Sequence, residues 1–203
     1  MTVQAPLQSQ LLWLQIPGEL ALQVTPEQFT ALAAANRELR LERTATGELI
    51  VTPPTGGMSG KRNLSISAQL GVWFEANDTL GEAFDSSTGF ELPNGANRSP
   101  DAAWVQKDRW EALTDEQREG FVPLCPDFVI ELRSKTDKLK VLQTKMQEYI
   151  ANGAQLGWLI DPKTRQVEIY RPGQAAEILD NPSTLSGEVV LPGFILTLKR
   201  IWA

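Results

Sequence analysis

The sequence predicts an α/β fold with a central mixed β-sheet flanked by helices. An apolar strand over residues 127–133 is followed by a helical pattern over 139–150 and a second apolar strand over 156–161. Parallel strands need a crossover of this length, so the three segments are typical of a βαβ unit. A turn after the second strand leads into a strand over 166–170, which would pair antiparallel and make the sheet mixed.

Glu131 is an unusual residue for the first of these strands. Alternation places it on the same face as Val129 and Arg133, opposite a row of large apolar side chains. A carboxylate in a buried strand costs free energy unless it is paired, holds a metal or takes part in a reaction. We therefore expect Glu131 to have a partner.

The crossover helix offers such a partner. Lys145 lies at the edge of its apolar arc, and helical side chains lean toward the N-terminus, so its amine should point back toward Glu131. A lysine that only snorkels from a half-buried position would fit the same pattern. The arc itself contains Leu139, Leu142, Met146, Tyr149 and Ile150.

The other elements are assigned from capping and turn signals. Thr25 and Gln28 form a capping box, and Pro26 takes the first position of the helix, which ends near Asn36. The apolar tail over 187–202 is expected to complete the sheet. Further elements are expected as a hairpin over 39–43 and 48–51, a helix over 56–76, strands over 82–90 and 101–105, and a capped helix after Thr114.

A length of 203 residues suits one domain, which we place at 25–203, preceded by an N-terminal arm over 1–24. The single cysteine, Cys125, excludes an intrachain disulfide and fits a reducing cytoplasm. No apolar run reaches the ~18 residues that would span a membrane. The apolar residues of the arm that predict docking are Leu11, Leu12, Trp13, Leu14 and Ile16.

The chain has no histidine, which excludes Ser-His-Asp and Cys-His catalysis and histidine metal sites. Oxygen ligands remain, and these select hard cations such as Mg²⁺ or Mn²⁺. The net charge of −6 opposes indiscriminate nucleic-acid binding. A local basic cluster could face phosphate or could be a solvated surface. Its members are Arg133, Lys135, Lys138, Lys140 and Lys145.

Asp101 and Glu131 are the two carboxylates that could carry chemistry. Each lies on a short strand, and the helix-sized insertion between them allows the strands to be neighbours. Two carboxylates at adjacent strand ends can hold a divalent cation, with a backbone carbonyl and waters completing its shell. Such a cation activates water and neutralises charge on a phosphodiester.

Three sequence segments carry a family resemblance. The strings SPDAAWV (99–105), PDFVIELRS (126–134) and GWLIDP (157–162) are similar to the Uma-type putative restriction endonuclease family of the PD-(D/E)XK nuclease superfamily. The resemblance covers most of the chain and implies a restriction-endonuclease-like core. It also implies hydrolysis of DNA phosphodiester bonds with Mg²⁺ or Mn²⁺ held by Asp101 and Glu131.

The resemblance assigns further roles with one departure. The family's lysine position, two residues after Glu131, holds Arg133, which keeps the charge but cannot act as a base. The resemblance allows the lysine to have moved to the following helix, where Lys145 stands. Arg133 and Lys145 are therefore the candidates for orienting water and stabilising charge, beside Asp101 and Glu131. Because cleavage of both strands needs two centres, we also expect a homodimer.

Other interpretations remain open. Asp101 could cap the turn after Pro100, and Glu131 could form only a structural salt bridge. The chain could be a catalytically silent module that binds nucleic acid or protein, which the net charge and Arg133 favour. A metal-free carboxylate hydrolase, such as a glycosidase, would need a cleft lined with aromatic residues.

Overall fold

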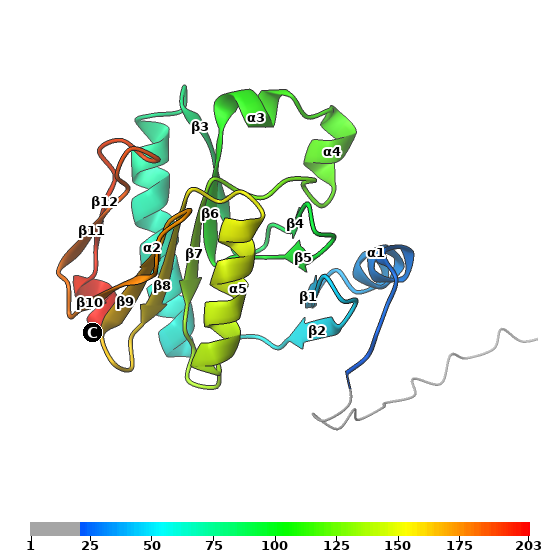
Figure 1. Ribbon diagram of the computed structural model, residues 1–203, viewed down its shortest axis with the longest axis horizontal. Helices are drawn as coiled ribbons and strands as arrows, with labels where there is room; N and C mark the ends of the chain where they lie inside the picture. The colour runs from blue at the N-terminus through cyan, green and yellow to red at the C-terminus, as the bar shows by residue number, and fades with distance from the viewer. Residues whose placement is uncertain (1–20) are drawn as a thin grey trace, which may run out of the picture.

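The computed structural model describes residues 21–203 of the chain (Figure 1). Most of the predicted arm over 1–24, including the apolar residues from Leu11 to Ile16, lies outside the described residues. Within the described part, Gln23 forms an antiparallel β-bridge with Glu48.

A six-stranded mixed sheet forms the centre of the fold, in the order β10-β9-β8-β7-β6-β3. The pair β7–β8 is parallel and the other neighbours are antiparallel, which confirms the predicted mixed sheet and its βαβ unit. The strands are β3 (Gly81–Asp85), β6 (Ala102–Gln106), β7 (Phe128–Leu132), β8 (Leu156–Asp161), β9 (Gln166–Tyr170) and β10 (Glu177–Asp180).

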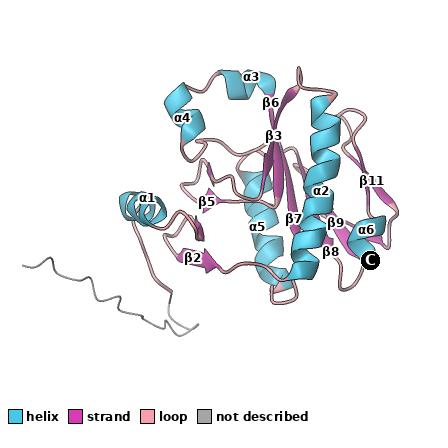
Figure 2. Cartoon of the chain, turned by 180° about the vertical axis from the view of Figure 1, so that it is seen from behind, coloured by secondary structure: helices cyan, strands magenta, loops and turns pink. Residues whose placement is uncertain are grey.

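One long helix covers each face of this sheet: α2 (Gly57–Glu75) and α5 (Leu139–Ala151) lie on opposite sides (Figures 1 and 2). Ile130 packs in the apolar cluster that contains α2, whereas Val129 packs with Met146 and Tyr149 of α5. The alternation predicted for the strand is therefore confirmed. Glu131 consequently faces α5.

A smaller four-stranded sheet, in the order β2-β1-β5-β4, stands beside α5 (Figure 1). Its hairpin confirms the predicted one, with Glu42 opposite Ile50. Arg43 pairs with Asn97, so the hairpin is joined to the segment that leads into Asp101. Its strands are β1 (Arg40–Arg43), β2 (Leu49–Thr52), β4 (Phe90–Glu91) and β5 (Asn97–Arg98).

Both predicted capping boxes are confirmed, at Thr25 for α1 (Pro26–Ala35) and at Thr114 for α4 (Asp115–Glu119). Two short helices complete the set, α3 (Lys107–Glu111) and α6 (Lys199–Trp202). Among residues 21–203, no helix has the length and apolar character needed to cross a membrane.

The structure corrects two of the predicted strands. The strand expected over 82–90 is interrupted, because the Asp85 carboxylate accepts hydrogen bonds from the amide and hydroxyl of Ser87 and turns the chain into the second sheet. The tail over 187–202 does not complete the central sheet. Its strand β12 (Ile195–Thr197) pairs with β11 (Thr184–Ser186) in a separate sheet, and its apolar residues cover the α2 face.

Gly81 and Gly71 allow a test of the packing around β3. A Cβ atom on Gly81 would press on the Val105 carbonyl oxygen and lie 2.6 Å from Trp104 Cζ2, whereas one on Gly71 in α2 would meet nothing within 4 Å. We expect Gly81→Ala to lower the free energy of unfolding by about 2–3 kcal/mol. Gly71→Ala, the matched control, should raise it by up to about 1 kcal/mol. Urea denaturation measures both, and equal effects would contradict the packing described.

Candidate active site

Asp101 lies directly before β6 and close to Glu131 of the neighbouring strand β7. The next residue, Ala102, begins β6 and pairs with Ile130. The Asp101 amide donates to the Ile130 carbonyl at 2.9 Å, and Asp101 Oδ2 accepts from the Leu132 amide at 2.8 Å. These two hydrogen bonds are made to the residues on either side of Glu131, so the backbone of β7 holds the Asp101 carboxylate near that of Glu131.

Helix α5 brings two polar groups to Glu131. Lys145 Nζ lies 2.7 Å from Glu131 Oε1, and the Tyr149 hydroxyl donates to the same oxygen at 3.1 Å. The two residues are four positions apart on α5, so they project from the same side of the helix. The predicted approach of Lys145 to Glu131 is confirmed.

Lys145 also contacts a carboxylate that the sequence analysis overlooked. Its Nζ lies 2.8 Å from Oε1 of Glu42, which comes from β1 of the smaller sheet. The same Glu42 oxygen accepts from the Ser99 amide at 3.0 Å. Glu42 therefore links the amine of Lys145 to the backbone two residues before Asp101.

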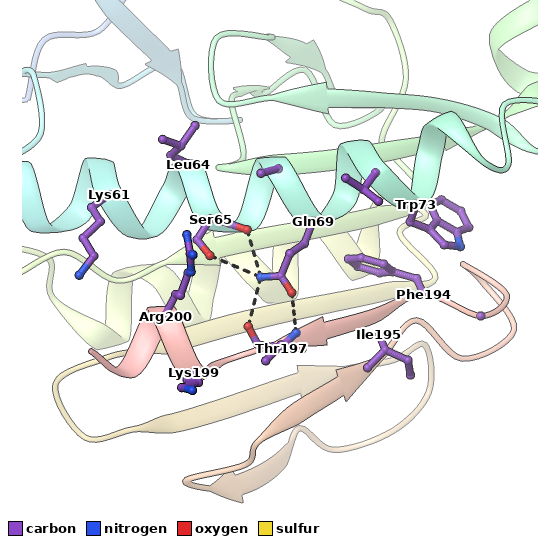
Figure 3. Close-up of a pocket in the computed structure, with 13 residues that line it drawn as sticks. Lys61, Leu64, Ser65, Gln69, Trp73, Phe194, Ile195, Thr197, Lys199 and Arg200 are labelled. Atoms are coloured by element: carbon purple, nitrogen blue, oxygen red, sulfur yellow. Dashed lines mark hydrogen bonds between the residues drawn. The ribbon is translucent and has the colours of Figure 1, made fainter.

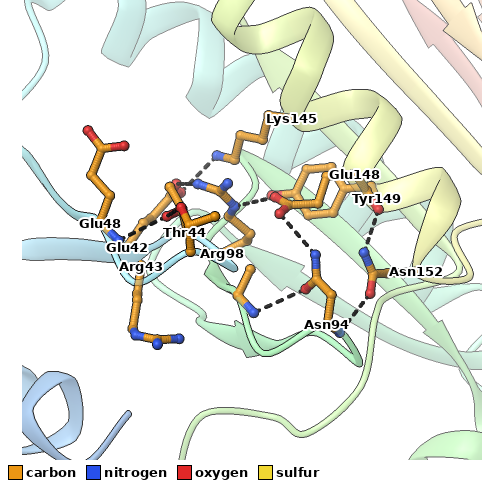
Figure 4. Close-up of polar contacts among 12 residues, drawn as sticks. Glu42, Arg43, Thr44, Glu48, Asn94, Arg98, Lys145, Glu148, Tyr149 and Asn152 are labelled. Atoms are coloured by element: carbon orange, nitrogen blue, oxygen red, sulfur yellow. Dashed lines mark hydrogen bonds and ion pairs between the residues drawn. The ribbon is translucent and has the colours of Figure 1, made fainter. Parts of the chain in front are cut away.

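A second cation, Arg98, ties Glu42 to α5 (Figure 4). Arg98 Nη1 lies 3.3 Å from Glu42 Oε2, and Arg98 Nε donates to Glu148 Oε2 at 2.6 Å. Asn94 donates to the other Glu148 oxygen at 3.0 Å. The charged side chains of the smaller sheet and of α5 thus form one connected network of ion pairs.

Arg40 completes the site from its exposed side. Its Nη1 lies 3.2 Å from Asp101 Oδ1, and its Nη2 donates to the Ser99 carbonyl. The Arg40 side chain is 30% exposed and that of Asp101 15%, whereas those of Lys145 and Glu131 are 10% and 5% exposed. The site is therefore open to solvent at Asp101 and Arg40 and closed at Lys145.

Burial and neighbouring charges shift the protonation of these groups. Burial raises the pKa of Glu131 to about 7, and Asp101 and Glu42 add to this rise while Lys145 opposes it. Burial raises the pKa of Glu42 too, but Lys145 and Arg98 outweigh it and keep the pKa below its ordinary value. Burial also raises the pKa of Tyr149 well above its ordinary value, so the hydroxyl stays a donor.

The donor set suits a hard divalent cation. Asp101 and Glu131 provide carboxylate oxygens close together. Both oxygens of Asp101 accept hydrogen bonds, from Arg40 and from the Leu132 amide, whereas of the two Glu131 oxygens only Oε1 has a partner among the described residues. The described residues contain no group of three or more His, Cys, Asp or Glu side chains arranged for a metal. Two protein carboxylates with water are a common arrangement for Mg²⁺, which keeps much of its hydration.

Arg133 lies apart from this group. Its Nη1 donates to Asp161 Oδ2 at 2.6 Å and its Nε to the Asp137 carbonyl at 3.2 Å. Parallel pairing of β7 with β8 places Asp161 beside Arg133, and the short ion pair holds the guanidinium there. Asp127 likewise has a structural role, since it accepts from the Gln106 amide and from Arg109.

Sequence signals for the overlooked residues exist but are weak. Glu42 lies between Leu41 and Arg43 in the four-residue strand β1. A short strand that mixes apolar and charged residues in this way is equally typical of an exposed hairpin. Tyr149 falls on the apolar arc of α5, where a buried hydroxyl usually requires a hydrogen-bond partner. Tyr149 follows Lys145 by four residues, and this helical spacing is the sequence signal that both side chains face Glu131.

A separate groove of about 880 Å³ lies between α2 and the C-terminal segment, on the other face of the sheet (Figure 3). Leu64, Val72 and Ile195 line it, and within residues 21–203 no carboxylate does. Four of the five tryptophans in residues 21–203 pack in or against the α2-side core, away from the carboxylates: Trp73, Trp104, Trp158 and Trp202. The fifth, Trp110 of α3, packs against Phe84 and Arg118. This placement does not favour a glycosidase.

Replacing Lys145 tests the buried charge network. Lys145→Met leaves Glu131 and Glu42 without their shared cation, so we expect the free energy of unfolding to fall by about 3–5 kcal/mol. The double variant Lys145→Met/Glu131→Gln also removes the carboxyl group that has lost its cation, and it should be at least as stable as the single variant. Urea denaturation at neutral pH measures both. A double variant less stable than Lys145→Met would contradict the ion-pair geometry.

Comparisons with known proteins agree with the fold. No curated protein matches the chain. A solved structure described as a putative nuclease belonging to DUF820 from Anabaena variabilis superposes with a TM-score of 0.73 at 21% identity, covering 88% of this chain and 97% of that one. This likeness shows the same fold. The model of the Uma2 family, described as putative restriction endonuclease, matches residues 26–199, and the chain therefore belongs to the Uma2 family.

Proposed function

We propose that this protein is an endonuclease that hydrolyses DNA phosphodiester bonds with Mg²⁺ or Mn²⁺ held by Asp101 and Glu131. The observation that carries the proposal is the meeting of three residues from separate elements. Asp101 is held near Glu131 by hydrogen bonds to the backbone of Ile130 and Leu132. Lys145 lies 2.7 Å from Glu131. Membership of a family described as putative restriction endonucleases supports the same activity.

Each residue of the proposed site has a role that follows from its chemistry. When bound, the cation would lower the pKa of water and neutralise charge on the phosphate. Asp101 and Glu131 hold it with their oxygens. Lys145 presents a cation beside Glu131, where it can orient the attacking water or stabilise negative charge in the transition state. Tyr149 and Glu42 fix the positions of Glu131 and Lys145 through the contacts described.

DNA would approach from the exposed side of the site. Asp101 and Arg40 are its most open members. The loop between β7 and α5 and the first turn of α5 carry the lysines of the basic cluster that remain exposed, since Lys145 is buried in the network and Arg133 is paired with Asp161. These positive charges can bind phosphates without reading sequence. The exposed lysines are Lys135, Lys138 and Lys140.

A symmetric dimer in the cytoplasm, with one centre for each DNA strand, stays a prediction from the sequence. The competing function is a silent module that keeps the fold and binds nucleic acid or protein. Arg133 in the usual lysine position favours it. The convergence of Asp101, Glu131 and Lys145 opposes it, because a binding module has no need of this costly buried arrangement.

Metal binding is the first test of the proposal. A cation that binds only the folded protein stabilises it, so millimolar Mn²⁺ should raise the melting temperature of the wild-type protein by a few degrees. Glu131→Ala should abolish the rise. Glu48→Ala, which removes an exposed carboxylate of the smaller sheet, should leave it intact. A similar rise in Glu131→Ala would argue against the site.

Cleavage kinetics separate the roles of the two cations. If Lys145 assists the reaction, Lys145→Ala should reduce turnover of plasmid DNA by roughly two to four orders of magnitude. Mn²⁺ binding should survive, because lysine is not a ligand. Arg133→Ala removes a cation that is paired with Asp161 outside the site, so turnover at saturating DNA should stay close to the wild-type level. Near-normal turnover of Lys145→Ala together with inactive Arg133→Ala would reverse the assignment, and an inactive wild-type protein would favour the silent module.

A further inference from the structure

Arg40 occupies a position that the proposed nuclease chemistry does not use. Its guanidinium contacts Asp101 Oδ1 at 3.2 Å and the Ser99 carbonyl, on the solvent side of the carboxylate pair. Asp101, Glu131 and Glu42 all favour its charged form electrostatically, although burial opposes it. The protein's own cation therefore compensates the carboxylate that would receive the metal.

The charges of the site are close to balanced without a metal. The carboxylates of Glu42, Asp101, Glu131 and Glu148 face the cations Arg40, Arg98 and Lys145. A dication held by Asp101 would share that carboxylate with Arg40, whose Nη1 lies 3.2 Å from Oδ1. Two positive charges that share one carboxylate repel each other strongly in a partly desolvated site.

We infer that Arg40 is a displaceable counter-ion of Asp101 that competes with the divalent cation and so sets the metal affinity of the site. The inference rests on the proposed function. Arg40 is the cation suited to this role because its side chain is 30% exposed and contacts a single carboxylate. Lys145 and Arg98 are 10% and 9% exposed and each contacts two carboxylates, so their displacement would cost more.

The point of attachment of Arg40 also permits movement. It is the first residue of β1, directly after the turn in which the Leu39 amide donates to the Asn36 carbonyl. The second contact of Arg40 is with the backbone carbonyl of Ser99. This group is uncharged, so no unpaired charge remains there when the guanidinium moves away. Once displaced, the guanidinium would remain at the open side of the site, where it can meet a DNA phosphate through paired hydrogen bonds.

The test is a titration of Mn²⁺ followed by the electron paramagnetic resonance signal of the free ion. Arg40→Gln removes the charge but keeps a polar side chain, and it should tighten Mn²⁺ binding roughly tenfold or more at low salt. The gain should shrink as salt screens the partly exposed site. Arg40→Lys, which retains the charge, should bind close to the wild-type level.

Arg37→Gln is the matched control, because it removes the same charge from an exposed position three residues earlier. Equal tightening in Arg37→Gln and Arg40→Gln would show only an effect of net charge and overturn the inference. Unchanged affinity in Arg40→Gln, with binding that still disappears in Glu131→Ala, would overturn it and leave the metal site standing. Absence of Mn²⁺ binding in every variant would overturn both proposals.

A measurement on the unaltered side chain covers the case in which Arg40→Gln fails to fold. The Arg40 Nε–H resonance of ¹⁵N-labelled wild-type protein should shift on titration with Mg²⁺, because the guanidinium changes its partner. The same resonance should stay fixed in Glu131→Ala. A resonance that does not respond to Mg²⁺ in a protein that binds the ion would contradict displacement.

Discussion

The buried amine of Lys145, held between the carboxylates of Glu42 and Glu131, is the interaction on which the site depends. The three residues come from β1, β7 and α5, so the contact joins the smaller sheet, the central sheet and the crossover helix. Each charge has lost most of its water, and only its partners offset that cost. The relative placement of these three elements is therefore constrained by charge as well as by apolar packing.

The central sheet supplies the geometry that this interaction requires. Parallel pairing of β7 with β8 forces the chain to cross over through α5, which carries Lys145 and Tyr149 back above Glu131. Antiparallel pairing of β6 with β7 brings Asp101, directly before β6, close to the same carboxylate. Polar groups thus reach Glu131 from α5 and from the start of β6, and both connections lie within residues 101–149.

These local connections explain what the sequence could predict. The strand around Glu131, the face on which it lies and the approach of Lys145 follow from alternation and helical periodicity within one βαβ unit. Glu42, Arg98 and Arg40 reach the site through the pairing of the smaller sheet, which depends on contacts between distant segments. No periodicity in a four-residue strand marks one glutamate as buried. The tail was misassigned for a similar reason, since apolar residues can cover a sheet as well as extend it.

The same network links stability to the proposed activity. Two carboxylates held close together repel each other, and the fold must offset this repulsion when no dication is bound. Here Lys145 stabilises Glu131 from within and Arg40 stabilises Asp101 from the solvent side. The inner cation contacts two carboxylates and is 10% exposed, whereas the outer one contacts a single carboxylate and is 30% exposed. In the proposed mechanism this difference in burial separates a fixed cation, Lys145, from an exchangeable one, Arg40.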